Sequence, residues 1–340
     1  MTELVDTSSA PLVSVVTPVF NGASYLAQCI DSVLAQTYQN WQYIIVDNYS
    51  TDGSREIATS YAERDPRISV LCNREHLGPV ANWNYSVSQI SPISKYCKIL
   101  HADDWLFPEC LAKMVELAES NPSVSIVSCY ILAGSTVLNG ELPYPSYVVS
   151  GRRVARGLLL REFDLQCTPT SQLIRVESIR GRRVLYDESP GIVYGIDRQL
   201  CLELLEDTDF GFVHQVLVFT RVHSGSLSSK IDEYSVNYPE AVRFLRRFGR
   251  MYLTDEEYQF CWNRETLTYS RFLGRSLFAF RGAEFWRYHK QQVLRLGLPM
   301  NSVRIGMDAL KEAIRIFGGP VARVVEQCRR SRGGSKSIVR

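Results

Sequence analysis

Over residues 12–130, short apolar segments alternate with longer amphipathic ones. The apolar runs are rich in β-branched residues and are predicted to be strands, at 13–17, 41–46, 68–71, 98–100 and 124–128. Between them, apolar residues recur at helical spacing, as at Leu26, Ile30 and Val33. Strands that alternate with helices of this length predict βαβ units, and hence a mainly parallel sheet with helices on both faces.

Three helix starts carry recognisable signals. Ser24 can cap a helix that follows the Asn21-Gly22 turn. Pro108 suits the first turn of a helix that runs to about Ser120, because its missing N–H would have no partner there. Thr254, with Glu257 three residues later, matches a capping box.

Beyond about Leu132 the alternation loosens. Glycine and proline residues mark a long connection over 134–145, and short strands are expected over 171–176 and 215–222. Past Tyr238 the chain is predicted to be helical, with aromatic-rich amphipathic stretches.

Composition and charge narrow the class of protein. The chain of 340 residues is 45% hydrophobic and 22% charged, and its net charge of +2 gives no reason to expect nucleic acid as a partner. The apolar run 12–20 is broken by Pro18 and is unlike a signal peptide. No stretch approaches the roughly 18 continuous apolar residues of a membrane span. Nine scattered cysteines without a C-x-x-C pair argue against a disulfide framework or zinc cluster, and favour a cytoplasmic location.

The last twenty residues, 321–340, carry six basic residues against one acid, Glu326. Such a tail predicts peripheral contact with an anionic membrane surface, on the inner face of the membrane. A solvated tail is the alternative.

Three polar clusters fall at predicted strand ends: 17–21, 47–53 and 101–104. In an open parallel α/β sheet, ligands bind beyond the carboxyl ends of the strands. These clusters become neighbours only if the predicted fold is correct, and they would then line one pocket.

The pair Asp103–Asp104 is the strongest candidate for a metal site. Adjacent carboxylates repel each other unless a cation or hydrogen-bond donors compensate them. Mg²⁺ or Mn²⁺ typically uses one or two carboxylates together with substrate phosphates. The alternative is that one of the two merely caps the following helix.

The stretch 47–53 offers acceptors for a base. The Asp47 carboxylate and the Asn48 amide oxygen could both accept the imide N–H of a uracil or thymine ring. Asp52-Gly53 is explained equally well as a turn.

Taken together, these motifs resemble the family 2 glycosyltransferases. The resemblance covers about the first 125 residues and rests on VSVVTPVFN (13–21), SVLAQTY (32–38), VDN with STDGS (46–54), Gly78 with NWN (82–84), and HADDWLFP (101–108). It implies the GT-A fold, an inverting mechanism, a divalent metal and a nucleotide-sugar donor of the UDP type.

Carried over residue by residue, the resemblance assigns roles at the strand ends. Thr17, Pro18 and Phe20 would line the nucleotide, with Phe20 flanking the base. Asp47 and Asn48 would read the base, Asp103 would approach the ribose, and Asp104 would ligate the metal. Two positions depart from the family pattern: His101 replaces a frequent acid, and Asn48 replaces a frequent aspartate.

The second half carries a fainter resemblance. Tyr186-Asp187-Glu188, followed by Gly195-Ile196-Asp197, is similar to the segment that supplies the catalytic base, and Asp197 matches the base position. A carboxylate there can take the proton of an attacking hydroxyl. Its alternative role is a helix N-cap.

Arg221-Val222-His223 and the serines after it resemble a loop that closes over the diphosphate. In that loop His223 is a candidate metal ligand, and a structural histidine is the alternative.

The expected activity is therefore transfer of a sugar from a nucleotide-sugar donor to a glycan or lipid-linked glycan, in surface-polysaccharide synthesis. A nucleotidyltransferase is a second hypothesis, although no basic residue follows the first strand; a non-catalytic nucleotide- or glycan-binding protein is a third. We divide the chain into a flexible N-terminus (1–11), a nucleotide-sugar-binding half (12–130), an acceptor-side region (131–235), a helical extension (236–330) and a basic tail (331–340).

Overall fold

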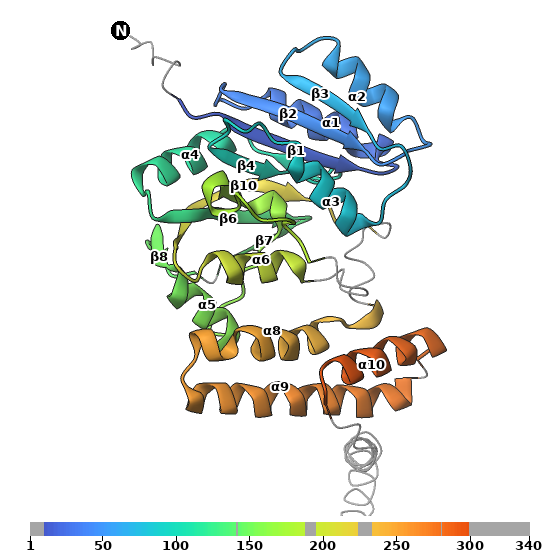
Figure 1. Cartoon of the computed structure of the whole chain (residues 1–340), viewed down its shortest axis with the longest axis vertical. Helices are drawn as coiled ribbons and strands as arrows, with labels where there is room; N and C mark the ends of the chain where they lie inside the picture. Colours follow the sequence, from blue (N-terminus) through green and yellow to red (C-terminus); the bar gives the residue numbers. More distant parts are fainter. Residues whose placement is uncertain (1–9, 141, 188–194, 224–232, 280, 299–340) are drawn as a thin grey trace, which may run out of the picture. The chain divides into compact units, whose positions relative to one another are not determined.

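A computed structural model describes residues 10–140, 142–187, 195–223, 233–279 and 281–298 (Figure 1). The predicted basic tail, the serines after His223 and nearly all of the predicted flexible N-terminus lie outside these residues. The chain divides into two units, residues 1–229 and residues 230–340.

The first unit contains a ten-stranded sheet in the order β3-β2-β1-β4-β9-β6-β10-β5, with β7 beside β6 and β8 beside β10. The strands are β1 (Val13–Val19), β2 (Trp41–Asp47), β3 (Ile68–Cys72), β4 (Tyr96–Ile99), β5 (Trp105–Leu106), β6 (Val124–Ala133), β7 (Thr136–Leu138), β8 (Val148–Ser150), β9 (Leu173–Arg175) and β10 (Asp209–Thr220). Strands β1 to β4 pair in parallel, and so do β6 and β10. Strand β9 lies antiparallel between β4 and β6, and thereby joins the two parallel groups.

Six α-helices of this unit are described: α1 (Ala23–Leu34), α2 (Ser54–Ala62), α3 (Pro79–Ser88), α4 (Cys110–Ser120), α5 (Gly151–Leu160) and α6 (Ile196–Leu204). Alternate residues of β1 show how they cover the sheet. Val13 and Val15 pack with the buried residues of α1 and α4, whereas Val16 packs with those of α3, α5 and α6 on the other face. The mainly parallel sheet with helices on both faces is confirmed.

The start of α1 corrects one prediction. Ser24 lies inside the helix, and Gly22 is its N-cap. The free N–H groups bond to side chains of the next turn instead: the Gly22 N–H donates to Ser54 Oγ, and the Ala23 N–H to Asp52 Oδ2, both at 2.9 Å. A local cap is unnecessary because a distant loop supplies the acceptors.

The start of α4 corrects another. Pro108 lies two residues before the helix, whose N-cap is Glu109. The Pro108 carbonyl accepts the Thr37 N–H at 2.9 Å, which ties this segment to the end of α1. The capping box at Thr254 is confirmed, since its hydroxyl accepts the Glu257 N–H and the Glu257 carboxylate accepts the Thr254 N–H.

The second unit is described through α8 (Asn237–Tyr252), α9 (Asp255–Ser276) and α10 (Ala283–Arg295). Its core is aromatic: Phe272 stacks on Tyr238 at 4.1 Å between ring centroids, and Tyr269 donates to or accepts from buried His289 at 2.8 Å. Among the described helices of the chain, none is both long and apolar enough to cross a membrane.

Candidate functional site

The parallel pairing of β2, β1 and β4 brings the three polar strand ends together. Val19 at the end of β1 lies opposite Asp47 at the end of β2, and the Asn48 N–H donates to the Val19 carbonyl at 2.8 Å. On the other side of β1, the Leu100 N–H donates to the Val16 carbonyl at 2.9 Å, which places residues 101–104 beside the same edge. The three clusters therefore border one region of the sheet.

The predicted nucleotide-lining residues of β1 differ in exposure. Thr17 is fully buried, and its hydroxyl pairs with the Tyr43 hydroxyl at 2.8 Å inside the core. Pro18 is also buried, whereas Phe20 is 49% exposed and lies edge-on to His76 at 4.4 Å between ring centroids. Phe20 is thus available to a ligand, and His76 is a neighbour that the sequence pattern did not reveal.

Asp47 and Asn48, the two residues predicted to hydrogen-bond the nucleotide base, have different hydrogen-bond partners in the protein. The Asn48 amide is committed to the protein: its oxygen accepts from Asn73 Nδ2 at 2.8 Å and from the Leu77 N–H at 2.9 Å, and its nitrogen donates to the Leu77 carbonyl. Asp47 accepts one bond from the Ser50 N–H at 3.2 Å. Its other oxygen, Oδ1, is buried and has no hydrogen-bond partner in the described part of the chain. Asp47 therefore has an acceptor to spare, while Asn48 orders the loop beside it.

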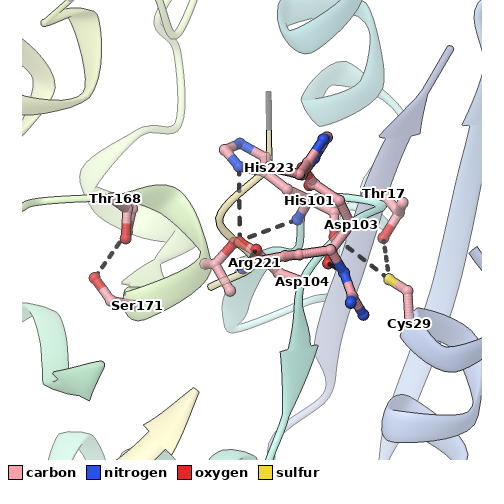
Figure 2. Close-up of polar contacts among 10 residues, drawn as sticks. Thr17, Cys29, His101, Asp103, Asp104, Thr168, Ser171, Arg221 and His223 are labelled. Atoms are coloured by element: carbon pink, nitrogen blue, oxygen red, sulfur yellow. Dashed lines mark hydrogen bonds and ion pairs between the residues drawn. The ribbon is translucent and has the colours of Figure 1, made fainter. Parts of the chain in front are cut away.

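Asp104 lies in the buried centre of the site (Figure 2). It is 3% exposed; its Oδ2 accepts from Thr170 Oγ1 at 2.8 Å, and its Oδ1 from the Arg221 N–H at 3.0 Å. Burial raises the pKa of this carboxyl to about 6, while the electrostatic effect of His101, whose Nδ1 is 4.0 Å from Oδ2, opposes that rise. A buried carboxylate of this kind is stabilised by a cation.

His101, Asp103 and Asp104 form a set of potential ligands. One donor atom from each lies within 4.8 Å of the others. Two carboxylates with an imidazole suit a divalent ion such as Mn²⁺, so these residues fit the metal that the resemblance implies. The helix-cap alternative for the acid pair is wrong, because both residues precede β5 and the cap of α4 is Glu109.

Arg221 and His223 follow β10 and contact the same acids. His223 Nε2 is 3.0 Å from Asp103 Oδ2, so its described partner is Asp103 and not Asp104. The Arg221 guanidinium donates to the Asp103 carbonyl at 3.1 Å and to Gln28 Oε1 at 2.7 Å. A permanent positive charge is thereby fixed beside the acids. The resemblance placed Arg221 in a loop over the diphosphate but gave it no contact with these acids.

Asp197 is partly buried in the first turn of α6. The N-cap of this helix is Gly195, with φ of 67°, so the N-cap alternative for Asp197 is wrong. Desolvation raises the pKa of Asp197 to about 6, while the electrostatic effect of His101 and a hydrogen bond from the Tyr186 hydroxyl lower it. Its Oδ1 is buried without a hydrogen-bond partner among the described residues. Such a carboxylate is suited to accept a proton near neutral pH.

The three residues 82–84 of α3 connect these parts. The Asn82 amide oxygen accepts from Asn73 Nδ2 at 2.9 Å, next to the Asn48 loop. The Trp83 ring stacks at 6.2 Å from the His101 ring and meets Tyr186 edge-on at 6.1 Å. Asn84 Oδ1 accepts the Tyr186 N–H at 2.8 Å, and its Nδ2 donates to the Tyr186 carbonyl at 2.9 Å. One helical turn thus holds both the base-side loop and the partner of Asp197.

Known proteins are similar to this chain in sequence and in fold. Residues 14–181 match the model for glycosyl transferase family 2. An uncharacterized glycosyltransferase of Rickettsia typhi is 27% identical over 74% of this chain and 78% of its own length. The putative teichuronic acid biosynthesis glycosyltransferase TuaG of Bacillus subtilis is 36% identical, over 32% of this chain and 43% of its own.

Solved structures share the fold. The S. aureus TarS 1–349 structure in complex with UDP-GlcNAc aligns with a TM-score of 0.61 and 14% identity, covering 89% of this chain and 91% of the other. The mannosyltransferase PcManGT from Pyrobaculum calidifontis, in complex with GDP-Man and Mn²⁺, aligns with a TM-score of 0.53 and 15% identity over 90% of this chain and 88% of the other. At these identities the likeness shows the fold alone.

Proposed function

This chain is a family 2 glycosyltransferase with the GT-A fold, and on that premise we propose an inverting transfer of a sugar from a UDP-sugar to a hydroxyl of a glycan or lipid-linked glycan. The observation that carries this proposal is a pair of desolvated carboxyls: that of buried Asp104, and that of partly buried Asp197, whose Oδ1 is shielded from water. Both have a pKa raised to about 6 by burial, and both lie within the field of His101. A single displacement at an anomeric carbon uses one carboxylate on the donor side, to hold the metal, and a second carboxylate as the base for the acceptor hydroxyl.

The proposed donor lies over the ends of β1, β2 and β4. Phe20 packs against one face of the base, and the free Oδ1 of Asp47 accepts a base N–H. We assign Asn48 an indirect role, since its amide holds residues 73–77 at the edge of this region. Uracil, with its single imide N–H, matches one free carboxylate oxygen. The UDP-GlcNAc in TarS and the GDP-Man in PcManGT show that similar folds take either base.

The proposed ligands for a divalent ion are Asp104 and Asp103, with His101 as the third donor. His223 contacts Asp103, so we assign its ring a further contact with the ribose or a phosphate instead of a bond to the metal. The chemistry that Mn²⁺ or Mg²⁺ supplies there is charge neutralisation of a leaving diphosphate.

The chain's own residues carry the remaining steps. Arg221, fixed beside Asp103, adds a permanent positive charge for the diphosphate. Asp197 removes the proton from the acceptor hydroxyl. The oxygen of that hydroxyl bonds to the anomeric carbon, and the nucleoside diphosphate leaves from the opposite side of the carbon. The Tyr186 hydroxyl, bonded to Asp197, holds the carboxylate in place and favours its ionised form.

The setting that we propose is surface-polysaccharide synthesis at the cytoplasmic side of a membrane. It rests on the name of the relative TuaG and on the basic residues of 321–340, which could meet anionic lipid.

Donor binding and transfer test this proposal together. In a thermal-shift panel of UDP-, dTDP- and GDP-sugars with Mn²⁺ or Mg²⁺, UDP-sugars with Mn²⁺ should give the largest stabilisation. Asp104→Ala should remove both this stabilisation and transfer. A panel in which GDP-sugars stabilise more strongly, or an Asp104→Ala variant with unchanged metal-dependent donor binding, would contradict the assignments.

A further inference from the structure

A cavity opens between α3, the residues that follow it and the segment 176–185. Its volume is about 280 Å³, near the lower end of the range for small-molecule pockets. Apolar side chains form its wall, including Val87, Ile90 and Ile179. No described role in the donor site involves this cavity.

The rim of the cavity is strongly basic. Arg180, Arg182 and Arg183 line it, and its lining residues include no carboxylate. Arg182 is paired with Glu203 at 2.7 Å. Arg180 gives one bond to the Pro92 carbonyl at 3.3 Å, and neither Arg180 nor Arg183 has an ion pair with a described carboxylate. Two guanidinium groups are therefore available to an anion.

The combination of an apolar wall and guanidinium groups selects a class of ligand. Guanidinium forks match the oxygens of a phosphate in bidentate fashion. An apolar wall adds affinity only for a ligand that also buries hydrocarbon. An amphiphilic phosphate satisfies both parts of the cavity, whereas a free phosphate satisfies one.

The cavity adjoins the proposed catalytic base through one residue. Asn84 lines the cavity, and its amide oxygen accepts the N–H groups of Leu185 at 3.1 Å and Tyr186 at 2.8 Å. Tyr186 in turn bonds to Asp197. An occupant of the cavity therefore lies on the acceptor side, behind the segment that holds the base.

We propose that this cavity binds the phosphate and adjoining hydrocarbon of a lipid-phosphate-linked acceptor. This inference rests on the proposed glycosyl transfer for the identity of the ligand as acceptor, but the binding itself can be measured without any activity.

Titration calorimetry of the full chain tests the binding. Dodecyl phosphate below its micellar concentration should bind more tightly than inorganic phosphate, and the neutral dodecyl maltoside should not compete. Arg180→Ala/Arg183→Ala should weaken dodecyl phosphate binding about tenfold, from the loss of charge-assisted hydrogen bonds. Arg55→Ala/Arg64→Ala, which removes the same charge from two exposed positions at α2, should leave it unchanged.

Three results would overturn the proposal: equal weakening by both double variants, inorganic phosphate binding as tightly as dodecyl phosphate, or an unchanged KM of the Arg180/Arg183 variant for a lipid-phosphate acceptor. Both double variants should unfold at the wild-type temperature, because the four side chains are exposed. Dodecyl phosphate binding in a protein that transfers no sugar would refute the proposed function and leave the cavity's ligand class standing.

Discussion

At the scale of single residues, the site depends on two carboxyls that are largely shielded from water, those of Asp104 and Asp197. The Asp104 carboxylate accepts hydrogen bonds from the Thr170 hydroxyl and the Arg221 N–H, whereas one oxygen of Asp197 has no hydrogen-bond partner among the described residues. A buried carboxyl with a spare lone pair costs stability when it ionises, and that cost is the expected sign of a catalytic role.

Replacing the proposed base should therefore inactivate the protein and stabilise it. The pKa of Asp197 rises from 3.8 in an unfolded chain to about 6. The folded state binds the proton more tightly, so ionisation of Asp197 lowers stability as pH rises from about 4 to 6, by up to about 3 kcal/mol. Asp197→Asn should abolish transfer, retain UDP binding, and raise the unfolding temperature at pH 7.5 but not at pH 4. Loss of UDP binding equal to that in Asp104→Ala would refute separate roles.

The dependence of the transfer rate on pH should reflect the ionisation of Asp197. A base must be ionised to act, so kcat/KM at saturating Mn²⁺ should fall about tenfold per pH unit below about 6 and level off above it. The measurement is initial rate against pH with a UDP-sugar and a fixed acceptor. A profile that stays flat down to pH 5 would exclude Asp197 as the base.

At the scale of elements, two short segments organise the site. The turn before α2 caps α1 as well as its own helix, because Asp52 accepts from the Ala23 N–H, the Ser54 N–H and the Ser54 hydroxyl. The turn of α3 at residues 82–84 reaches the donor side at one end and Tyr186 at the other.

Removing the shared cap should destabilise the first unit. Asp52→Ala should lower the free energy of unfolding by about 1–2 kcal/mol, the upper range for a helix cap, since acceptors for both helices are lost. Glu56→Ala, an exposed acid in the first turn of α2, is the matched control and should cost less. Chemical denaturation measures both; equal losses would show that the cap is not shared.

Substitutions at the two ends of the 82–84 turn should change different kinetic parameters. Asn84→Ala should lower kcat and move the pH midpoint upward, because a misplaced Tyr186 no longer lowers the pKa of Asp197. Asn82→Ala should mainly raise the KM for the donor through the Asn73 contact. Identical kinetic changes in the two variants would mean that the turn acts only as structural support.

At the scale of the whole molecule, every residue that we assign to the site lies within residues 1–229. Donor binding should therefore slow hydrogen exchange at the ends of β1, β2 and β4 and leave α8, α9 and α10 unchanged. Exchange mass spectrometry with and without UDP and Mn²⁺ measures this directly. Equal protection of α9 would assign the second unit a part in donor binding.

The sequence alone determined the parallel part of the sheet, the helices on both faces and the acids at the strand ends. These follow from local periodicity and from the rule that parallel strands end at one edge. By resemblance it also proposed Asp197 as the catalytic base, and that assignment stays a prediction. The predicted helix starts at Ser24 and Pro108 were wrong because these segments bond to distant parts of the chain, which a local sequence pattern does not reveal.

Only the tertiary structure decided which polar groups remain available. In the tertiary structure the Asn48 amide bonds within the protein, and His101 and Arg221 lie beside the acids. One oxygen of Asp47 and one of Asp197 have no hydrogen-bond partner among the described residues. Antiparallel β9 and the long β10 carry residues of the second half into the site, through contacts more than sixty residues apart such as Thr170 with Asp104. The physical reason is that a strand pattern predicts where a side chain lies along the chain, whereas burial and hydrogen bonding depend on everything that packs around it.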